Sequence, residues 1–191
     1  MKLILENWKK FLKESNDDIV SFIKRVKDSK SNNCRSIDFR IESSRFKCLG
    51  VGTDKYVFTD LKKPGWVLKF EKANPVKDSS TMEVVVWRYL NNTPFEKILS
   101  PIEEHDGFYY MARSSAPGNY QQLEDDLFSI SKDINVKFKD LEYYFLSDAN
   151  KDNIGLIDGK TVLVDYDDAY TWVRNNKALI KQLKGGNNVR R

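Results

Sequence analysis

The chain has 191 residues, of which 40% are hydrophobic, 13% aromatic and 31% charged. This composition predicts one small folded unit with a well-solvated surface, and it excludes an intrinsically disordered chain. The net charge of +4 is small and the charges are interspersed, so we expect no nucleic-acid partner. No uninterrupted apolar stretch of about 20 residues occurs, so we expect no membrane span.

Cysteine and histidine are scarce. Cys34 and Cys48 are the two cysteines, and we expect them to be thiols in a reducing cytoplasm rather than part of a disulfide-built secreted fold. His105 is the single histidine, which excludes a multi-histidine metal site and nearly excludes a histidine-based catalytic triad. The sequence has no C-x-x-C pair and no His/Cys cluster, so we expect no structural zinc site.

Two amphipathic helices are predicted to open the chain, over 3–14 and 17–27, followed by a polar loop at 29–33. The first helix is basic, which also suits a membrane surface, but packing onto the rest of the domain is the plainer interpretation. From Phe39 to Phe70, apolar residues alternate in short runs interrupted by glycine and proline. This pattern predicts three antiparallel strands.

The second half of the chain is predicted to be mostly helical. In chain order we expect a helix at 79–91, strands at 98–104 and 108–113, a helix at 120–138, a hairpin at 156–164 and a closing helix at 172–183. The dipeptide Asp158-Gly159 is a strong hairpin-turn signal. The element order predicts an α+β fold with a β-rich half before a helical half.

Gly50 and Gly52 lie between two β-like runs. Glycines at this spacing allow a hairpin turn to approach a ligand closely and to point its N–H groups at phosphate oxygens. The plainer alternative is an ordinary turn. A dinucleotide-binding fold is excluded because a strand follows instead of a helix, and a P-loop is excluded because no Gly-Lys-Ser/Thr occurs.

Lys69 lies inside the apolar run 66–70, where a buried ammonium group requires a partner. Strand alternation places it on the face opposite Leu68 and Phe70. One interpretation is an edge strand with Lys69 in solvent; the other is a lysine that points into a cleft. Glu83, in a second apolar run, is a candidate partner, although a glutamate in such a run more often faces solvent.

Acidic and amide side chains surround the predicted hairpin, at 148–153 before it and at 165–168 after it. Mg²⁺ takes oxygen ligands and usually shares them with phosphates, so this cluster predicts a magnesium site. A plain polar loop is the alternative. A calcium-binding EF-hand fits poorly, because Gly155 comes too late, the twelfth position lacks glutamate, and strands rather than helices flank the loop.

Together these clusters resemble the protein-kinase-like superfamily, whose first motifs are a Gly-rich loop G-x-G-x-x-G-x-V and a strand lysine V-A-I-K. Gly50, Gly52 and Val57 resemble the loop in register, with Lys55 in place of the third glycine. The segment that ends at Lys69 resembles the strand lysine motif.

The later motifs of the same superfamily are a helix glutamate, H-R-D-x-x-x-x-N and D-F-G. Glu83 resembles the helix glutamate, Asp148 and Asn153 keep the D-x-x-x-x-N spacing, and Asp165 takes the place of the D-F-G aspartate. The run 164–169 resembles more closely the I-D-W/F-x-D-A version of aminoglycoside phosphotransferase and related small-molecule kinases. The resemblance extends over about 46–169.

The chain also departs from the family pattern. Leu146 replaces the family histidine, and Tyr166-Asp167 replaces Phe-Gly. Few residues follow Ala169, which leaves no room for an activation segment or a full helical lobe. This brevity resembles the reduced kinases of bacteriophages, and it implies a viral chain acting in the cytoplasm of a host.

The resemblance implies a small antiparallel-sheet N-lobe and a strongly reduced helical C-lobe. The expected segments are a helical extension at 1–33, a β-rich nucleotide-binding lobe at 34–113, a reduced catalytic lobe at 114–184 and a flexible tail at 185–191. The implied cofactors are ATP and Mg²⁺.

The resemblance also implies a role for each matched residue. The expected roles are phosphate binding by Gly50, Gly52 and Lys69, alignment of Lys69 by Glu83, Mg²⁺ binding by Asn153 and Asp165, proton acceptance from the substrate hydroxyl by Asp148, and adenine binding by Met111, Ala112 and Arg113, with Val57 beside the nucleotide.

The expected function is phosphoryl transfer from ATP to a hydroxyl group, with Ser or Thr of a protein, including a host protein, as the acceptor. Two alternatives remain open at this point. One is a pseudokinase that binds nucleotide without transfer; the other is a protein that inhibits or retunes a host factor through its surface.

Overall fold

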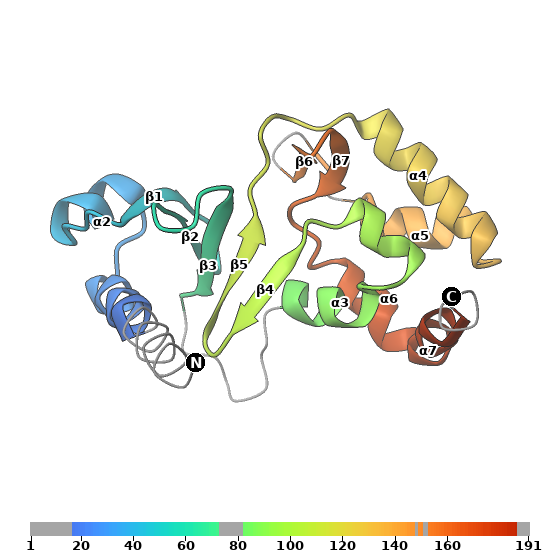
Figure 1. Ribbon diagram of the computed structural model, residues 1–191, viewed down its shortest axis with the longest axis horizontal. Helices are drawn as coiled ribbons and strands as arrows, with labels where there is room; N and C mark the ends of the chain where they lie inside the picture. Colours follow the sequence, from blue (N-terminus) through green and yellow to red (C-terminus); the bar gives the residue numbers. More distant parts are fainter. Residues whose placement is uncertain (1–16, 73–81, 148, 151–152, 187–191) are drawn as a thin grey trace, which may run out of the picture.

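The computed structural model describes residues 17–72, 82–147, 149–150 and 153–186. It has an α+β fold, in which a five-stranded antiparallel sheet separates the N-terminal helices from the C-terminal ones (Figure 1). The predicted α+β class is therefore confirmed, while the helix predicted at 3–14 lies outside the described residues. Within the described part of the chain, no helix combines the length and the apolar character that crossing a membrane requires.

The five strands of the sheet are each four to six residues long. They are β1 (Phe46–Val51), β2 (Lys55–Asp60), β3 (Trp66–Glu71), β4 (Ile102–His105) and β5 (Phe108–Ala112). Their order is β1-β2-β3-β5-β4, with every neighbouring pair antiparallel. The three predicted strands before residue 71 are present. The fourth begins later than predicted, because η1 (Pro94–Ile98) forms a 3₁₀ helix where it was expected to start.

The two faces of the sheet belong to two separate hydrophobic clusters. On one face Phe58, Leu68 and Phe70 pack against the helical segment 17–29, whose Phe22 lies at ring contact with Phe58. The opposite face contributes a set of buried side chains to the larger cluster beneath the C-terminal helices. These are Val67, Tyr109 and Met111. This two-sided burial follows from strand alternation.

Helix α2 (Cys34–Arg40) corrects the prediction that strands begin in this region. The Asn33 side chain caps it by accepting a hydrogen bond from the Ser36 N–H, which is a typical N-cap arrangement. Ile37 is 1% exposed and packs on the sheet, whereas Phe39 is 90% exposed. The alternating apolar residues suggested a strand, but the segment is a helix that buries only the face carrying Ile37.

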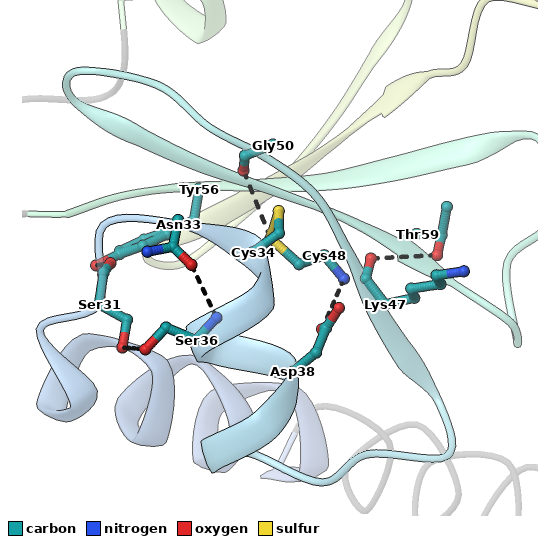
Figure 2. Close-up of a disulfide and its surroundings, with 10 residues drawn as sticks. All are labelled: Ser31, Asn33, Cys34, Ser36, Asp38, Lys47, Cys48, Gly50, Tyr56 and Thr59. Atoms are coloured by element: carbon teal, nitrogen blue, oxygen red, sulfur yellow. Dashed lines mark hydrogen bonds between the residues drawn. A yellow bond between two sulfur atoms is a disulfide. The ribbon is translucent and has the colours of Figure 1, made fainter.

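Cys34 and Cys48 form a disulfide, which contradicts the expectation of two thiols (Figure 2). Their Cα atoms lie 5.2 Å apart because α2 packs directly on β1. The side chain of Asp38 supports this contact by accepting a hydrogen bond from the Cys48 N–H at 3.3 Å. Since the helix was not predicted, the proximity of the two cysteines was not predicted either.

Removing the disulfide is expected to destabilise the fold by about 3 kcal/mol, the value typical of a closed loop of this length. Urea unfolding with and without a reductant measures the effect on the parent chain. The double variant Cys34→Ser/Cys48→Ser should match the reduced parent and should not respond to reductant. An unchanged midpoint in the reduced parent would show that the bond contributes nothing.

The C-terminal half contains more helices than predicted. They are α3 (Met82–Leu90), α4 (Tyr120–Asp133), α5 (Phe138–Phe145), α6 (Ala169–Asn175) and α7 (Lys177–Gly186). The single helix predicted at 120–138 ends at Asp133, and Asn135 then takes a φ of 55° before α5 begins. The closing helix is divided at Asn176, and α7 continues through Gly186 into the segment expected as a tail.

The predicted hairpin is present as β6 (Ile154–Ile157) and β7 (Lys160–Leu163). Asp158 and Gly159 both have positive φ, as a two-residue hairpin turn requires. The segment after β7 is held close to the residues that precede β4, because the Tyr166 hydroxyl donates a hydrogen bond to the carbonyl of Ser100 at 2.9 Å.

Gly155 allows the connecting segment after β5 to lie directly against β6. A Cβ atom at this position would lie 2.4 Å from the side chain of Ser114, so no larger residue fits. Pro117 forms an isolated bridge with Gly155. This close approach sets the position of the hairpin and of the polar residues on either side of it.

Candidate functional site

Lys69 lies in β3, with strands on both sides of it. Its neighbours Leu68 and Phe70 are fully buried on the opposite face. Lys69 is itself 8% exposed, and its Nζ donates to Glu83 Oε1 and to the carbonyl of Val164, both at 2.9 Å. Since β3 pairs with β2 and with β5, the alternative of an edge strand with Lys69 in solvent is wrong.

Glu83 lies in the first turn of α3 and is fully buried. Its carboxylate accepts hydrogen bonds from Lys69 Nζ, from Lys55 Nζ at 3.0 Å and from the Tyr109 hydroxyl. Burial by itself raises the pKa of a carboxyl group, but these partners outweigh it and hold the pKa of Glu83 well below its ordinary value. Glu83 is therefore ionised, and the alternative that it faces solvent is wrong.

Two further carboxylates follow β7 and approach Glu83. One oxygen from each of Glu83, Asp165 and Asp167 lies within 4.8 Å of the other two. Burial, together with the Glu83 charge, raises the pKa of Asp165 to about 6 and also raises the pKa of Asp167. The three carboxylates repel one another, and a cation among them would relieve that repulsion.

Asp167 contributes an oxygen that has no donor among the described residues. Its Oδ1 is buried and lacks a hydrogen-bond partner in the part of the chain that the structure describes, while its Oδ2 pairs with Lys55 Nζ. A buried carboxylate oxygen without a donor is unfavourable unless an ion or water satisfies it. Carboxylate oxygens are the ligands that Mg²⁺ prefers. The oxygen set around Asp165 and Asp167 therefore fits a divalent cation.

Gly50 lies near the end of β1, opposite Val57 of β2. Gly52 lies in the turn that follows, and its N–H donates to the carbonyl of Lys55 at 3.0 Å. Neither glycine has a positive φ. A Cβ atom on Gly50 would meet no other atom within 4 Å, and one on Gly52 would make only ordinary contact. The fold itself does not require glycine at either position.

Val57 and Asn153 lie next to the ion pair between Lys69 and Glu83. Val57 is opposite Lys69 in the register of β2 with β3 and packs on the larger hydrophobic cluster. The carbonyl of Asn153 accepts a hydrogen bond from the Val164 N–H at 2.9 Å, which places Asn153 beside the residue that precedes Asp165. The structure thus brings Asn153, Asp165, Lys69 and Val57 into one region.

The predicted adenine-binding residues take two different environments. Met111 is 1% exposed and its side chain fills the core on the Lys69 face of the sheet. Arg113 is exposed after β5, and within the described ranges no ion pair or hydrogen bond joins its side chain to the carboxylates. The N–H groups of Ala112 and Arg113 donate to the carbonyls of Pro101 and Gly65.

A cleft of about 230 Å³ opens beside Asp165 and Asp167. Its walls include Ser147 and Asp168, which are joined by a hydrogen bond from Ser147 Oγ at 3.1 Å. The predicted catalytic residue Asp148 lies outside the described residues. Ala149, which follows it, also lines the cleft.

No individual role was predicted for Lys55, and Asp167 was predicted only as part of the acidic cluster 165–168. The available signals were the replacement of the third glycine by a lysine, and the position of Asp167 two residues after Asp165. Neither signal shows that the two side chains meet, because 112 residues separate them in the sequence. The ion pair between them depends on the folded structure.

A scan against protein-family models finds no match to the chain, and a search of curated proteins finds no related sequence.

Proposed function

We propose that this protein is an ATP- and Mg²⁺-dependent phosphotransferase with a protein-kinase-like fold, which acts on a Ser or Thr hydroxyl of a protein. One observation carries the proposal: the buried Lys69 ammonium group joins Glu83 of α3 to the backbone carbonyl that precedes Asp165. In protein kinases, an ion pair between a strand lysine and a helix glutamate aligns the lysine with the ATP phosphates.

The turn between β1 and β2 gives independent support. Because the backbone and the packing do not require glycine at Gly50 or Gly52, another reason is needed for two glycines at this spacing. Close approach of a ligand to the backbone is such a reason. Lys55, at the end of the same turn, reaches the Glu83 carboxylate.

Each residue then has a defined role. Lys69, held by Glu83, binds phosphate oxygens of the nucleotide. Asp165 and Asn153 hold Mg²⁺, with Asp167 beside them. When bound, Mg²⁺ neutralises negative charge on the transferred phosphoryl group. Positioning and charge neutralisation provide most of the rate enhancement in this type of reaction.

The acceptor hydroxyl would enter the cleft beside Asp165. On the D-x-x-x-x-N spacing, we assign to Asp148 the role of accepting the hydroxyl proton. The residues on either side of it, Ser147 and Ala149, line the cleft. The cleft therefore extends from the proposed metal site to the residues that flank Asp148 in the sequence.

Lys69→Met is expected to lower phosphoryl transfer by at least about 100-fold, because it removes a cation that stabilises charge on the transferred group. The measurement uses purified protein, γ-labelled ATP and Mg²⁺, with heat-treated bacterial lysate proteins and casein as acceptors. Chelation of Mg²⁺ should abolish transfer by the parent protein.

Lys62→Met is the matched control, because Lys62 is exposed in the turn after β2 and the substitution removes the same charge. It should transfer phosphate at the parental rate. Equal rates for Lys69→Met and the parent would contradict the proposal. An ATP-dependent rise in melting temperature without any transfer would instead identify a nucleotide-binding protein that lacks the activity.

A further inference from the structure

Lys55 places a second ammonium group on the carboxylate that holds Lys69. Its Nζ lies 3.0 Å from Glu83 Oε2, while Lys69 Nζ lies 2.9 Å from Oε1 of the same side chain. The two cations reach Glu83 from neighbouring strands, β2 and β3. One buried carboxylate therefore positions two lysines side by side.

The orientation of Lys55 is unusual for a residue at the end of a hairpin turn. A lysine at such a position normally extends into water, because holding it in one geometry costs side-chain entropy. Here the Lys55 side chain is 15% exposed and also pairs with Asp167, which lies beyond β7. Burial lowers the pKa of an ammonium group, but Glu83 and Asp167 outweigh it and raise the pKa of Lys55, so it remains charged.

The charges of the site indicate what this second lysine does. The two ammonium groups and the three carboxylates sum to a net charge of −1. A divalent cation among the carboxylates changes the sum to +1, which favours an anionic ligand. Without Lys55 the same site would be neutral with the cation bound, and its attraction for a polyphosphate would be lost.

We propose that Lys55 is a second phosphate-binding residue, which contacts the polyphosphate of the nucleotide together with Lys69. The proposal rests on the nucleotide-dependent function proposed above. On this proposal, the lysine that replaces the third glycine compensates for the shorter glycine motif by supplying a positive charge. Glu83 is then the common positioning residue for both lysines.

The test compares the affinity of the parent and of Lys55→Met for ATP, ADP and AMP in the presence of Mg²⁺, by isothermal titration calorimetry. Lys55→Met is expected to weaken ATP binding by at least about tenfold, since a charge-assisted hydrogen bond to phosphate is lost. The loss should be smaller for ADP and close to none for AMP. A general disturbance of the fold would weaken all three nucleotides equally.

Two further variants complete the experiment. Lys55→Arg keeps the charge and should bind ATP within about threefold of the parent. Lys47→Met removes an exposed lysine of β1, the strand that precedes β2. It should leave all three affinities unchanged. Thermal unfolding of each variant separates binding effects from stability effects.

The possible failures are distinguishable. If the parent binds ATP and Lys55→Met binds it equally well, Lys55 is only an ion-pair link between β2 and the segment after β7, and this inference is wrong while the proposed function stands. Equal losses for ATP and AMP would also overturn it. If the parent binds no nucleotide at all, both the inference and the proposed function fall.

Discussion

Asp165→Asn is expected to lower the rate of phosphoryl transfer by at least about 10³-fold and at the same time to make the fold more stable. The loss of activity follows from the proposed role of Asp165, because an amide is a much weaker ligand for Mg²⁺ than a carboxylate. The gain in stability follows from the crowding of three carboxylates within 4.8 Å. Removing one negative charge relieves the repulsion.

The size of the stability effect depends on pH. Burial and the Glu83 charge raise the pKa of Asp165 to about 6, so the folded protein binds this proton more tightly than the unfolded chain does. The ionised carboxylate therefore lowers the free energy of unfolding at neutral pH, by about 1–2 kcal/mol after allowance for solvent screening. The stabilisation by Asp165→Asn should be fully present above pH 6 and should shrink as the pH falls toward 4.

Thermal and urea unfolding at pH 7.5 and at pH 5 measure this dependence, and the labelled-ATP assay measures activity. The control is Asp158→Asn, the same chemical change at the exposed hairpin turn, where asparagine also tolerates the positive φ of 50°. Neither property should change in the control. If Asp165→Asn were less stable than the parent at neutral pH, the carboxylate would stabilise the fold. It would then not be a ligand that is kept charged at the expense of stability.

The elements with strong local signals were predicted correctly. The hairpin of β6 and β7 depends on Asp158-Gly159, whose positive φ angles are a property of that dipeptide, and the face of Lys69 depends only on strand alternation. Helix α2 was not predicted, because seven residues provide too little periodicity and the exposed Phe39 suggested alternation instead. The cap residue Asn33 was the one local signal for it.

The site was predictable where a residue contradicted its local surroundings. Lys69 and Glu83 each place a charge in an apolar run, so each required a partner, and the structure joins them. Lys55 and Asp167 lie among polar residues, where a charge needs no explanation. Their contact depends on how β2 and the segment after β7 meet, which no local pattern encodes. The disulfide escaped prediction for the same reason, since it follows from the packing of α2 on β1.

Glu83→Gln is expected to destabilise the fold by about 3–5 kcal/mol, the usual effect of removing one partner from a buried ion pair. The side chain keeps its size, so the effect is one of charge. Lys55 retains Asp167 as a partner, but the buried Lys69 ammonium group is left with an amide and a backbone carbonyl. Urea unfolding at neutral pH measures the loss.

Two comparisons test this explanation. Glu104→Gln removes a carboxylate of the exposed pair with Arg88, and it should change the free energy of unfolding by less than about 1 kcal/mol. The double variant Glu83→Leu/Lys69→Met replaces the buried pair with apolar side chains and should recover most of the stability. Additive losses in the double variant would mean that the two side chains stabilise the fold independently.

The pH dependence of Glu83→Gln should be opposite to that of Asp165→Asn. The pKa of Glu83 lies well below its ordinary value of 4.5, so its contribution is present above that pH and is lost as the pH falls further. The parent and Glu83→Gln should therefore become more similar in strong acid, whereas the parent and Asp165→Asn already converge between pH 6 and 4. Two carboxylates in one cluster thus differ in role: Glu83 is stabilised by two lysines that it aligns, and Asp165 is kept charged at the expense of stability, as a ligand for a cation would be.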